Sequence, residues 1–161
     1  MRGRGAVFAA AAAIAALATW YFWRGDEGAI EDRLAALAED INATAGTGLG
    51  AGAHAAQIGR HFTDSAVVDL GQGAPIEGRA TIVGMLARLE PRTAQFTVRF
   101  QDTTVRALTD GAAEVNLTAE ISSRGEKQRD TWMDAREFAV SFRKVGDDWL
   151  IASVRAVETI R

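Results

Sequence analysis

Four long segments in the second half of the chain alternate apolar and polar residues, and they constrain the fold more than any other feature. They span Gln95–Leu108, Ala112–Ser122, Gln128–Lys144 and Trp149–Ile160, with short turns at residues 109–111, 124–125 and 146–148 between them. A period of two is typical of strands, and short turns join antiparallel neighbours. This half of the chain is therefore predicted to form an antiparallel meander.

The alternation changes phase inside the first of these segments. Phe96, Val98 and Phe100 occupy even positions, whereas Val105 occupies an odd one. One extra residue near Asp102, as in a β-bulge, produces such a shift and bends the strand. The sheet is therefore predicted to be curved.

The third segment has a bulky face and a small face. Its even positions carry Trp132, Phe138 and Phe142, whereas its odd positions include Ala135 and Ala139. The bulky face is suited to the core of a domain. Small, weakly polar residues on the other face indicate that the outer side of the sheet meets another surface, most simply that of a second copy.

The residues before the meander are predicted to form three helices and two short strands. Apolar residues recur at helical spacing in three groups: Ile30, Leu34, Leu37 and Ile41; Ile58 and Phe62; and Ile82, Met85, Leu86 and Leu89. A glycine-rich connector at residues 44–54 separates the first two helices, and Ala66–Leu70 and Pro75–Glu77 are extended. Helices followed by a meander indicate the α+β class.

An uncharged run of 18 residues, Ala6–Trp23, precedes this domain. As a helix it is about 27 Å long, which just reaches across the hydrocarbon core of a bilayer. Arg2 and Arg4 stand before the run, so the positive-inside rule places a short tail, residues 1–5, in the cytoplasm and the domain, residues 26–161, outside it.

This run is interpreted either as a transmembrane anchor or as a cleaved signal peptide. Half of it is alanine, and residues 16–18 have the small-x-small form that signal peptidase cuts, which leaves Thr19 as the new N-terminus. The residues typical of a helix end at a membrane interface are Trp20, Tyr21, Trp23 and Arg24. We favour the anchor. The expected protein crosses a bacterial inner membrane once and exposes its domain to the periplasm or the exterior.

Charge and composition argue against several classes of function. The net charge is −3, and since Arg2 and Arg4 contribute +2, the remaining chain carries −5, which is unsuited to binding nucleic-acid phosphates. There is no cysteine, so disulfides and thiolate metal sites are excluded. His54 and His61 have no evident third ligand, and no metal or other cofactor is predicted.

The order of the elements and three short motifs resemble the NTF2-like (SnoaL-like) superfamily. These motifs are "HFTDSAVVDL" at residues 61–70, "PIEGRATIVGML" at residues 75–86 and "DDWLIASVRAV" at residues 147–157. The resemblance covers residues 26–161. It implies a cone in which three helices pack on a curved antiparallel sheet, with a pocket open at one end and an outer face that often forms dimers.

The resemblance also implies which residues surround the inside of the cone. They are Phe62, Phe96, Phe100, Trp132, Asp134, Arg136 and Trp149. Asp134 and Arg136 alternate onto one face, where they form either an intrastrand ion pair or a polar ligand site. The sequence leaves open whether the aromatic residues fill the cone or surround a ligand.

The sequence lacks the catalytic groups of the isomerases in this superfamily. Those enzymes use a carboxylate base, a tyrosine and a second acid. Here Leu70 stands at the base position, and the only tyrosine is Tyr21, outside the domain. Asp64, Asp69 and His61 remain as candidates for a general base, with turn, capping or surface roles as the alternatives.

The sequence thus favours a non-catalytic module that acts in protein-complex assembly or in binding an apolar ligand. The expected partners are the membrane, through residues 6–23, and either a second copy or the other subunits of a membrane complex. Nucleic acid is not expected. The alternative is a SnoaL-like enzyme, of isomerase or dehydratase type, that acts on a hydrophobic small molecule.

Overall fold

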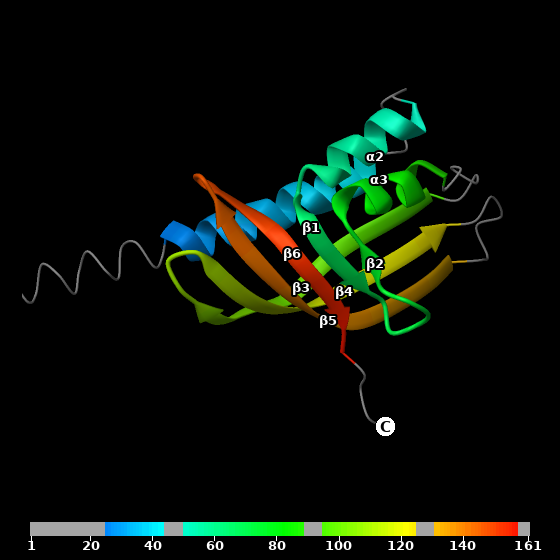
Figure 1. Ribbon diagram of the computed structural model, residues 1–161. Coiled ribbons are helices and arrows are strands. Elements are labelled where there is room, and N and C mark those ends of the chain that lie inside the picture. Colours follow the sequence, from blue (N-terminus) through cyan, green and yellow to red (C-terminus); the bar gives the residue numbers. More distant parts are fainter. Residues whose placement is uncertain (1–24, 44–49, 89–94, 125–130, 158–161) are drawn as a thin grey trace, which may run out of the picture.

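Three helices and one six-stranded sheet make up residues 25–43, 50–88, 95–124 and 131–157, the part of the chain that the computed structural model describes (Figure 1). The first helix covers residues 25–42, and the other two are α2 (Ala51–Gly59) and α3 (Arg79–Arg88). The strands are β1 (Phe62–Asp69), β2 (Ile76–Glu77), β3 (Gln95–Leu108), β4 (Ala112–Arg124), β5 (Thr131–Val145) and β6 (Asp148–Ala156). The predicted α+β class is confirmed.

The sheet is mixed, which corrects the prediction of an antiparallel sheet. Its strand order is β2-β1-β6-β5-β4-β3, and all neighbours are antiparallel except β1 and β6, which run parallel with Phe62 opposite Ile151. The last strand of the meander, β6, pairs with β1, so residues far apart in the sequence become neighbours. Local alternation carries no information about such a partner.

The bulge predicted in β3 is present. The register between β3 and β4 shifts between Gln101 and Thr104, and Asp102 has a φ of 50°. A left-handed residue outside glycine is uncommon, and aspartate is among the side chains that tolerate it best. The bulge bends β3, and the sheet curves beneath the first helix (Figure 1).

The core lies between the first helix and the inner face of the sheet. Ile30, Leu34 and Leu37 project from the helix at spacings of four and three and are buried. The buried residues that face them from the sheet include Val115, Leu117, Val140, Phe142, Trp149 and Ile151. Full burial of one such aliphatic side chain stabilises the fold by about 1.5–3 kcal/mol, so this stripe holds the helix on the sheet.

Two boundaries in the first half differ from the prediction. α2 begins at Ala51, inside the stretch expected to be a connector, because alanine is a strong helix former and offsets the cost of Gly52. The helix ends at Gly59, and Phe62 opens β1 instead of continuing the helical stripe with Ile58.

Candidate functional site

The residues predicted to surround the inside of the cone occupy different environments. Phe62 and Trp149 are buried in the core, and Phe100 is partly buried against it. The side chains of Phe96 and Trp132 lie outside the described part of the structure. Where the structure describes the inner face next to the first helix, aliphatic and aromatic side chains therefore fill it.

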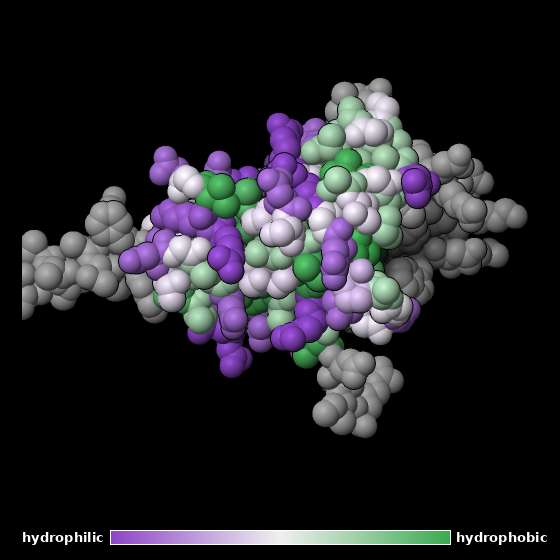
Figure 2. All heavy atoms as spheres, viewed as in Figure 1, coloured by the Kyte–Doolittle hydropathy of each residue, from purple (hydrophilic) through white to green (hydrophobic). Residues whose placement is uncertain are grey.

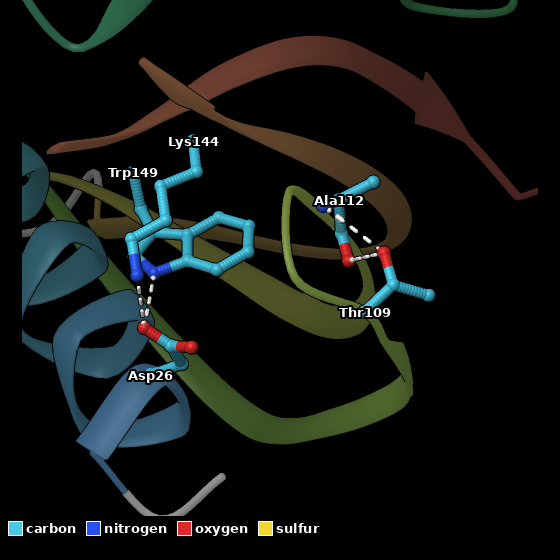
Figure 3. Close-up of polar contacts among 5 residues, drawn as sticks. All are labelled: Asp26, Thr109, Ala112, Lys144 and Trp149. Atoms are coloured by element: carbon cyan, nitrogen blue, oxygen red, sulfur yellow. Dashed lines mark hydrogen bonds and ion pairs between the residues drawn. The ribbon is translucent and has the colours of Figure 1, made fainter. Parts of the chain in front are cut away.

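Trp149 also connects the last strand to the start of the first helix (Figure 3). Its Nε1 donates a hydrogen bond to Oδ1 of Asp26 at 3.1 Å, and Nζ of Lys144 donates to the same oxygen at 2.8 Å. The Lys144 ammonium also lies 5.6 Å from the centre of the indole ring. The hydrogen bond from Lys144 lowers the pKa of Asp26 and outweighs the effect of burial, with a further contribution from Trp149.

The predicted pair on β5 is formed. Nε of Arg136 donates to Oδ2 of Asp134 at 3.0 Å. By strand alternation both side chains lie on the same face of the sheet as Phe138 and Val140. They lie nearer to the start of β5, where this face is not buried. Both are partly exposed, and each is the other's partner, as in the intrastrand interpretation.

Asp64 and Asp69, two candidates for a general base, have partners outside the core. Asp64 forms an ion pair with Arg79 at the start of α3, and its side chain is 86 % exposed. Oδ1 of Asp69 accepts a hydrogen bond from the backbone N–H of Gly71 at 2.9 Å, which closes the turn after β1. Asp69 faces a groove on the outer side of the sheet with Ser141 and Ser153.

His61, the third candidate, is held at the junction of α2 and β1. Its backbone carbonyl accepts a hydrogen bond from Ile151 at 2.8 Å, and its Nε2 lies 2.7 Å from Oδ2 of Asp40 on the first helix. The residue is only 5 % exposed, and its Nδ1 is buried without a hydrogen-bond partner. A general base needs a free nitrogen within reach of its substrate, and in this arrangement both ring nitrogens are enclosed.

Asp40 and Gln57 complete this cluster, and sequence reasoning did not identify either of them. Nε2 of Gln57 donates to Oδ1 of Asp40 at 2.5 Å. Burial raises the pKa of Asp40, but the hydrogen bonds from His61 and Gln57 lower it by more than burial raises it. The pKa is therefore below its ordinary value, and the carboxyl stays ionised at lower pH. The only signal in the sequence was the position of Asp40 on the polar side of an amphipathic helix.

The outer face of the sheet carries small and polar side chains, as predicted from β5. A groove of about 420 Å³ crosses it, and Ala139, Ser141 and Ser153 line its floor. The hydroxyl oxygens of Ser141 and Ser153 lie 2.6 Å apart. The exposed large apolar residues Leu70 and Val157 border a second hollow on the same face.

The structure describes neither residues 6–23 nor the predicted interface residues Trp20, Tyr21, Trp23 and Arg24. Among the helices of the described ranges, none combines the length and the apolar character needed to cross a membrane. In the same ranges, no three histidine or carboxylate side chains gather as ligands for a metal ion.

Comparison with known proteins finds similarity in structure and not in sequence. No protein-family model matches the chain, and no curated protein matches its sequence. Many solved structures do match, among them an NTF2-like protein with a cystatin-like fold from Novosphingobium aromaticivorans. Its TM-score is 0.69 at 14 % identity, over 87 % of this chain and 86 % of that one.

Two further neighbours carry provisional enzyme names. One is a provisionally assigned scytalone dehydratase from Novosphingobium aromaticivorans, with a TM-score of 0.69 at 13 % identity over 84 % of this chain and 85 % of that one. The other is a provisionally assigned dehydratase of the NTF2-like family from Streptomyces avermitilis, with a TM-score of 0.68 at 15 % identity over 86 % and 99 %. Identity this low relates folds and not activities. The chain therefore has the fold of the NTF2-like proteins.

Proposed function

We propose that this chain is a non-catalytic NTF2-like module, anchored by residues 6–23 outside the cytoplasmic membrane of a bacterium, where it acts in the assembly of a membrane complex. The observation that carries the proposal is that each of the three candidate bases is already engaged by another residue. Asp64 pairs with Arg79, Asp69 closes a turn on the outer side, and His61 is enclosed against Asp40. We favour assembly over the binding of an apolar ligand because apolar side chains occupy the described inner face.

The contacts at the start of the first helix support the proposal that the domain lies close to its anchor. Asp26 is bound by Lys144 and Trp149, so the folded domain begins almost directly after Arg24. A chain that enters the membrane at residues 6–23 then has almost no linker, and the domain keeps a fixed orientation with the turn between β5 and β6 near the bilayer. Such an orientation suits a subunit that presents one face to a partner.

The side chains on the outer face of the sheet support the proposal that this partner is a second copy of the chain. Ala139, Ser141 and Ser153 allow another sheet to approach closely, because their side chains are short. Met133 is 63 % exposed on the same side of β5, and Leu70 adds another exposed apolar side chain. Apolar residues exposed on a polar face are typical of an interaction surface.

Copurification of two differently tagged copies from membranes in mild detergent tests this function. We expect the two copies to be recovered together, and we expect Ala139→Arg to reduce the recovery about tenfold or more, because a buried guanidinium without a partner opposes the interface. Ala35→Arg is the matched control, since it makes the same substitution at an exposed position of the first helix. If the wild-type chain purifies as a lone monomer, the assembly function is wrong.

A dehydratase-type enzyme is the second candidate, and the contact between Asp40 and His61 favours it. A carboxylate that orients a histidine is a common arrangement for a general base. One structural neighbour is provisionally named a scytalone dehydratase. Nδ1 of His61, on the side of the ring opposite Asp40, is buried. A conformational change must therefore expose this nitrogen before His61 can contact a substrate.

Turnover of scytalone by the purified chain tests this second candidate. The enzyme hypothesis predicts turnover that His61→Gln abolishes and Asp64→Asn leaves intact, because the side chain of Asp64 is exposed outside the core. Absence of turnover, or equal loss in both variants, contradicts it. The non-catalytic proposal predicts no turnover in any of the three proteins.

A further inference from the structure

A pocket of about 440 Å³ lies beside the first helix, outside the hydrophobic core. Its walls come from the first helix, the junction of α2 and β1, the start of α3 and the first residues of β6. β6 pairs with β1 only from Ile151 onward, so the edge of β6 at Asp148 and Leu150 has no neighbouring strand there. This unpaired edge leaves the space that forms the pocket.

Three arginines from three elements line this pocket, which we call the arginine pocket: Arg33, Arg60 and Arg79. Leu150 is its only large apolar residue. Figure 2 shows hydrophilic residues gathered at the upper centre of the view, where the first helix passes the start of β1. Asp40 and Asp148 also line the pocket, so its lining carries three guanidiniums and two carboxylates.

The bonds that hold two of these arginines are readily exchanged. Arg33 pairs with Asp148 at 2.6 Å, but the Asp148 side chain is 72 % exposed. Arg79 pairs with Asp64, which is still more exposed. Exposed ion pairs contribute little to stability, because water solvates each partner almost as well. An anion that offered several oxygens would replace these carboxylates at low cost.

Arg60 has no such partner. Among the described residues its guanidinium makes no hydrogen bond or ion pair, and it interacts through space with Asp40. Asp40 attracts Arg60 through space but forms no ion pair with it, and the two carboxylate oxygens of Asp40 lie within hydrogen-bond distance of Gln57 and His61. Asp40 is thus held in place on one side of the pocket, and among the described residues Arg60 is the one of the three arginines that is not bonded to a carboxylate.

We propose that the arginine pocket binds a phosphate group, contacted by Arg33, Arg60 and Arg79. Guanidinium groups bind phosphate oxygens through paired N–H donors, and three of them arranged around one space suit an anion with more than two oxygens better than a carboxylate. The ligand is a small phosphate ester or the headgroup of an anionic lipid. This inference depends neither on self-association of the domain nor on the anchor.

Equilibrium dialysis of the full chain, in neutral detergent, against radiolabelled inorganic phosphate tests the proposal. We expect saturable binding at one site per chain that chloride does not displace at matched ionic strength. Arg60→Gln is expected to weaken the binding about tenfold or more, because it removes one guanidinium and its charge-assisted hydrogen bonds to phosphate. Arg106→Gln, an equal change of charge on the exposed part of β3, is expected to stay within about twofold of the wild type.

The two sources of phosphate are separated by competition. Displacement by glycerol 3-phosphate assigns a soluble ester, and displacement by dihexanoylphosphatidylglycerol assigns a lipid headgroup; either result supports the site. Arg79→Gln provides a second variant, and it is also expected to weaken binding. The proposal is overturned if phosphate does not bind saturably, or if Arg106→Gln weakens binding as much as Arg60→Gln does.

Discussion

The indole N–H of Trp149 donates to the carboxylate of Asp26 at 3.1 Å, and this contact ties the last strand to the first turn of the first described helix. Trp149 is 2 % exposed, so its indole N–H needs an acceptor within the protein. The carboxylate also binds Lys144, whose side chain crosses the indole ring (Figure 3). Asp26 therefore satisfies a buried donor and positions the end of the helix nearest to the predicted anchor.

Asp26→Ala is predicted to lower the free energy of unfolding by about 1–3 kcal/mol, because it leaves the buried indole donor without an acceptor. Urea unfolding of the full chain in mild detergent, followed by tryptophan fluorescence, measures the change. Asp32→Ala, an exposed carboxylate on the same helix, is the control and is expected to change the free energy by less than about 0.5 kcal/mol. Equal effects of the two variants contradict a structural role for the contact.

Acid is predicted to destabilise the domain through Asp26 and Asp40. Both carboxyls have a pKa below their ordinary value of 3.8, Asp26 mainly through Lys144, and Asp40 because its hydrogen bonds outweigh its burial. A lowered pKa in the folded state stabilises the fold fully above pH 3.8, and this stabilisation is lost as the pH falls through the lowered value.

The unfolding free energy, measured as a function of pH, checks this prediction. Asp40→Asn is expected to flatten the dependence below pH 3.8, because the amide does not titrate. Asp32→Asn serves as the comparison. A slope in Asp40→Asn as steep as that of the wild type contradicts the contribution of Asp40.

Asn42 is predicted to protect the free edge of the sheet. Its amide donates to the carbonyl of Val98 at 2.9 Å and accepts from the N–H of Val98 at 2.7 Å, so it replaces a neighbouring strand at that point of β3. Asn42→Ala should cost about 1–3 kcal/mol, since it removes both bonds. Hydrogen exchange at the Val98 amide should become faster, and unchanged exchange contradicts the assignment. Asn42→Asp keeps the acceptor and loses the donor, so it should protect the Val98 amide better than alanine does.

Gly59 is predicted to be required for the contact between α2 and α3. It is buried, and a Cβ at this position would overlap Cγ2 of Val83. Gly59→Ala should destabilise the domain by about 1–3 kcal/mol through overpacking. Val83→Ala removes the overlapping methyl groups, so the double variant should lose less stability than the two single variants together. Additive losses show that the contact is not the cause.

Local patterns predicted most of the strands. The period of two located β3 and β4 closely, and the phase change in β3 located the bulge at Asp102, because both features depend on neighbouring residues in one strand. The start of α2 was predicted less well. Glycines at residues 50 and 52 indicate a connector, but the alanines between and after them sustain a helix that packs on α3.

Contacts between distant segments were beyond local patterns. The parallel pairing of β1 with β6, the hydrogen bond between Asp40 and His61, and the four walls of the arginine pocket all join elements far apart in the sequence. Trp149 was predicted to surround the inside of the cone, but its hydrogen bond could not be predicted, because its acceptor, Asp26, is 123 residues away. Such contacts depend on how the whole chain folds, and the pattern of neighbouring residues does not predict them.

Native mass spectrometry of the chain, extracted from bacterial membranes in mild detergent, tests anchoring and self-association together, because one spectrum reports both the N-terminus of each subunit and the number of subunits. We expect an assembly of at least two copies, each beginning at Met1 or Arg2. A lone subunit that begins at Thr19 would contradict both the anchor and the self-association.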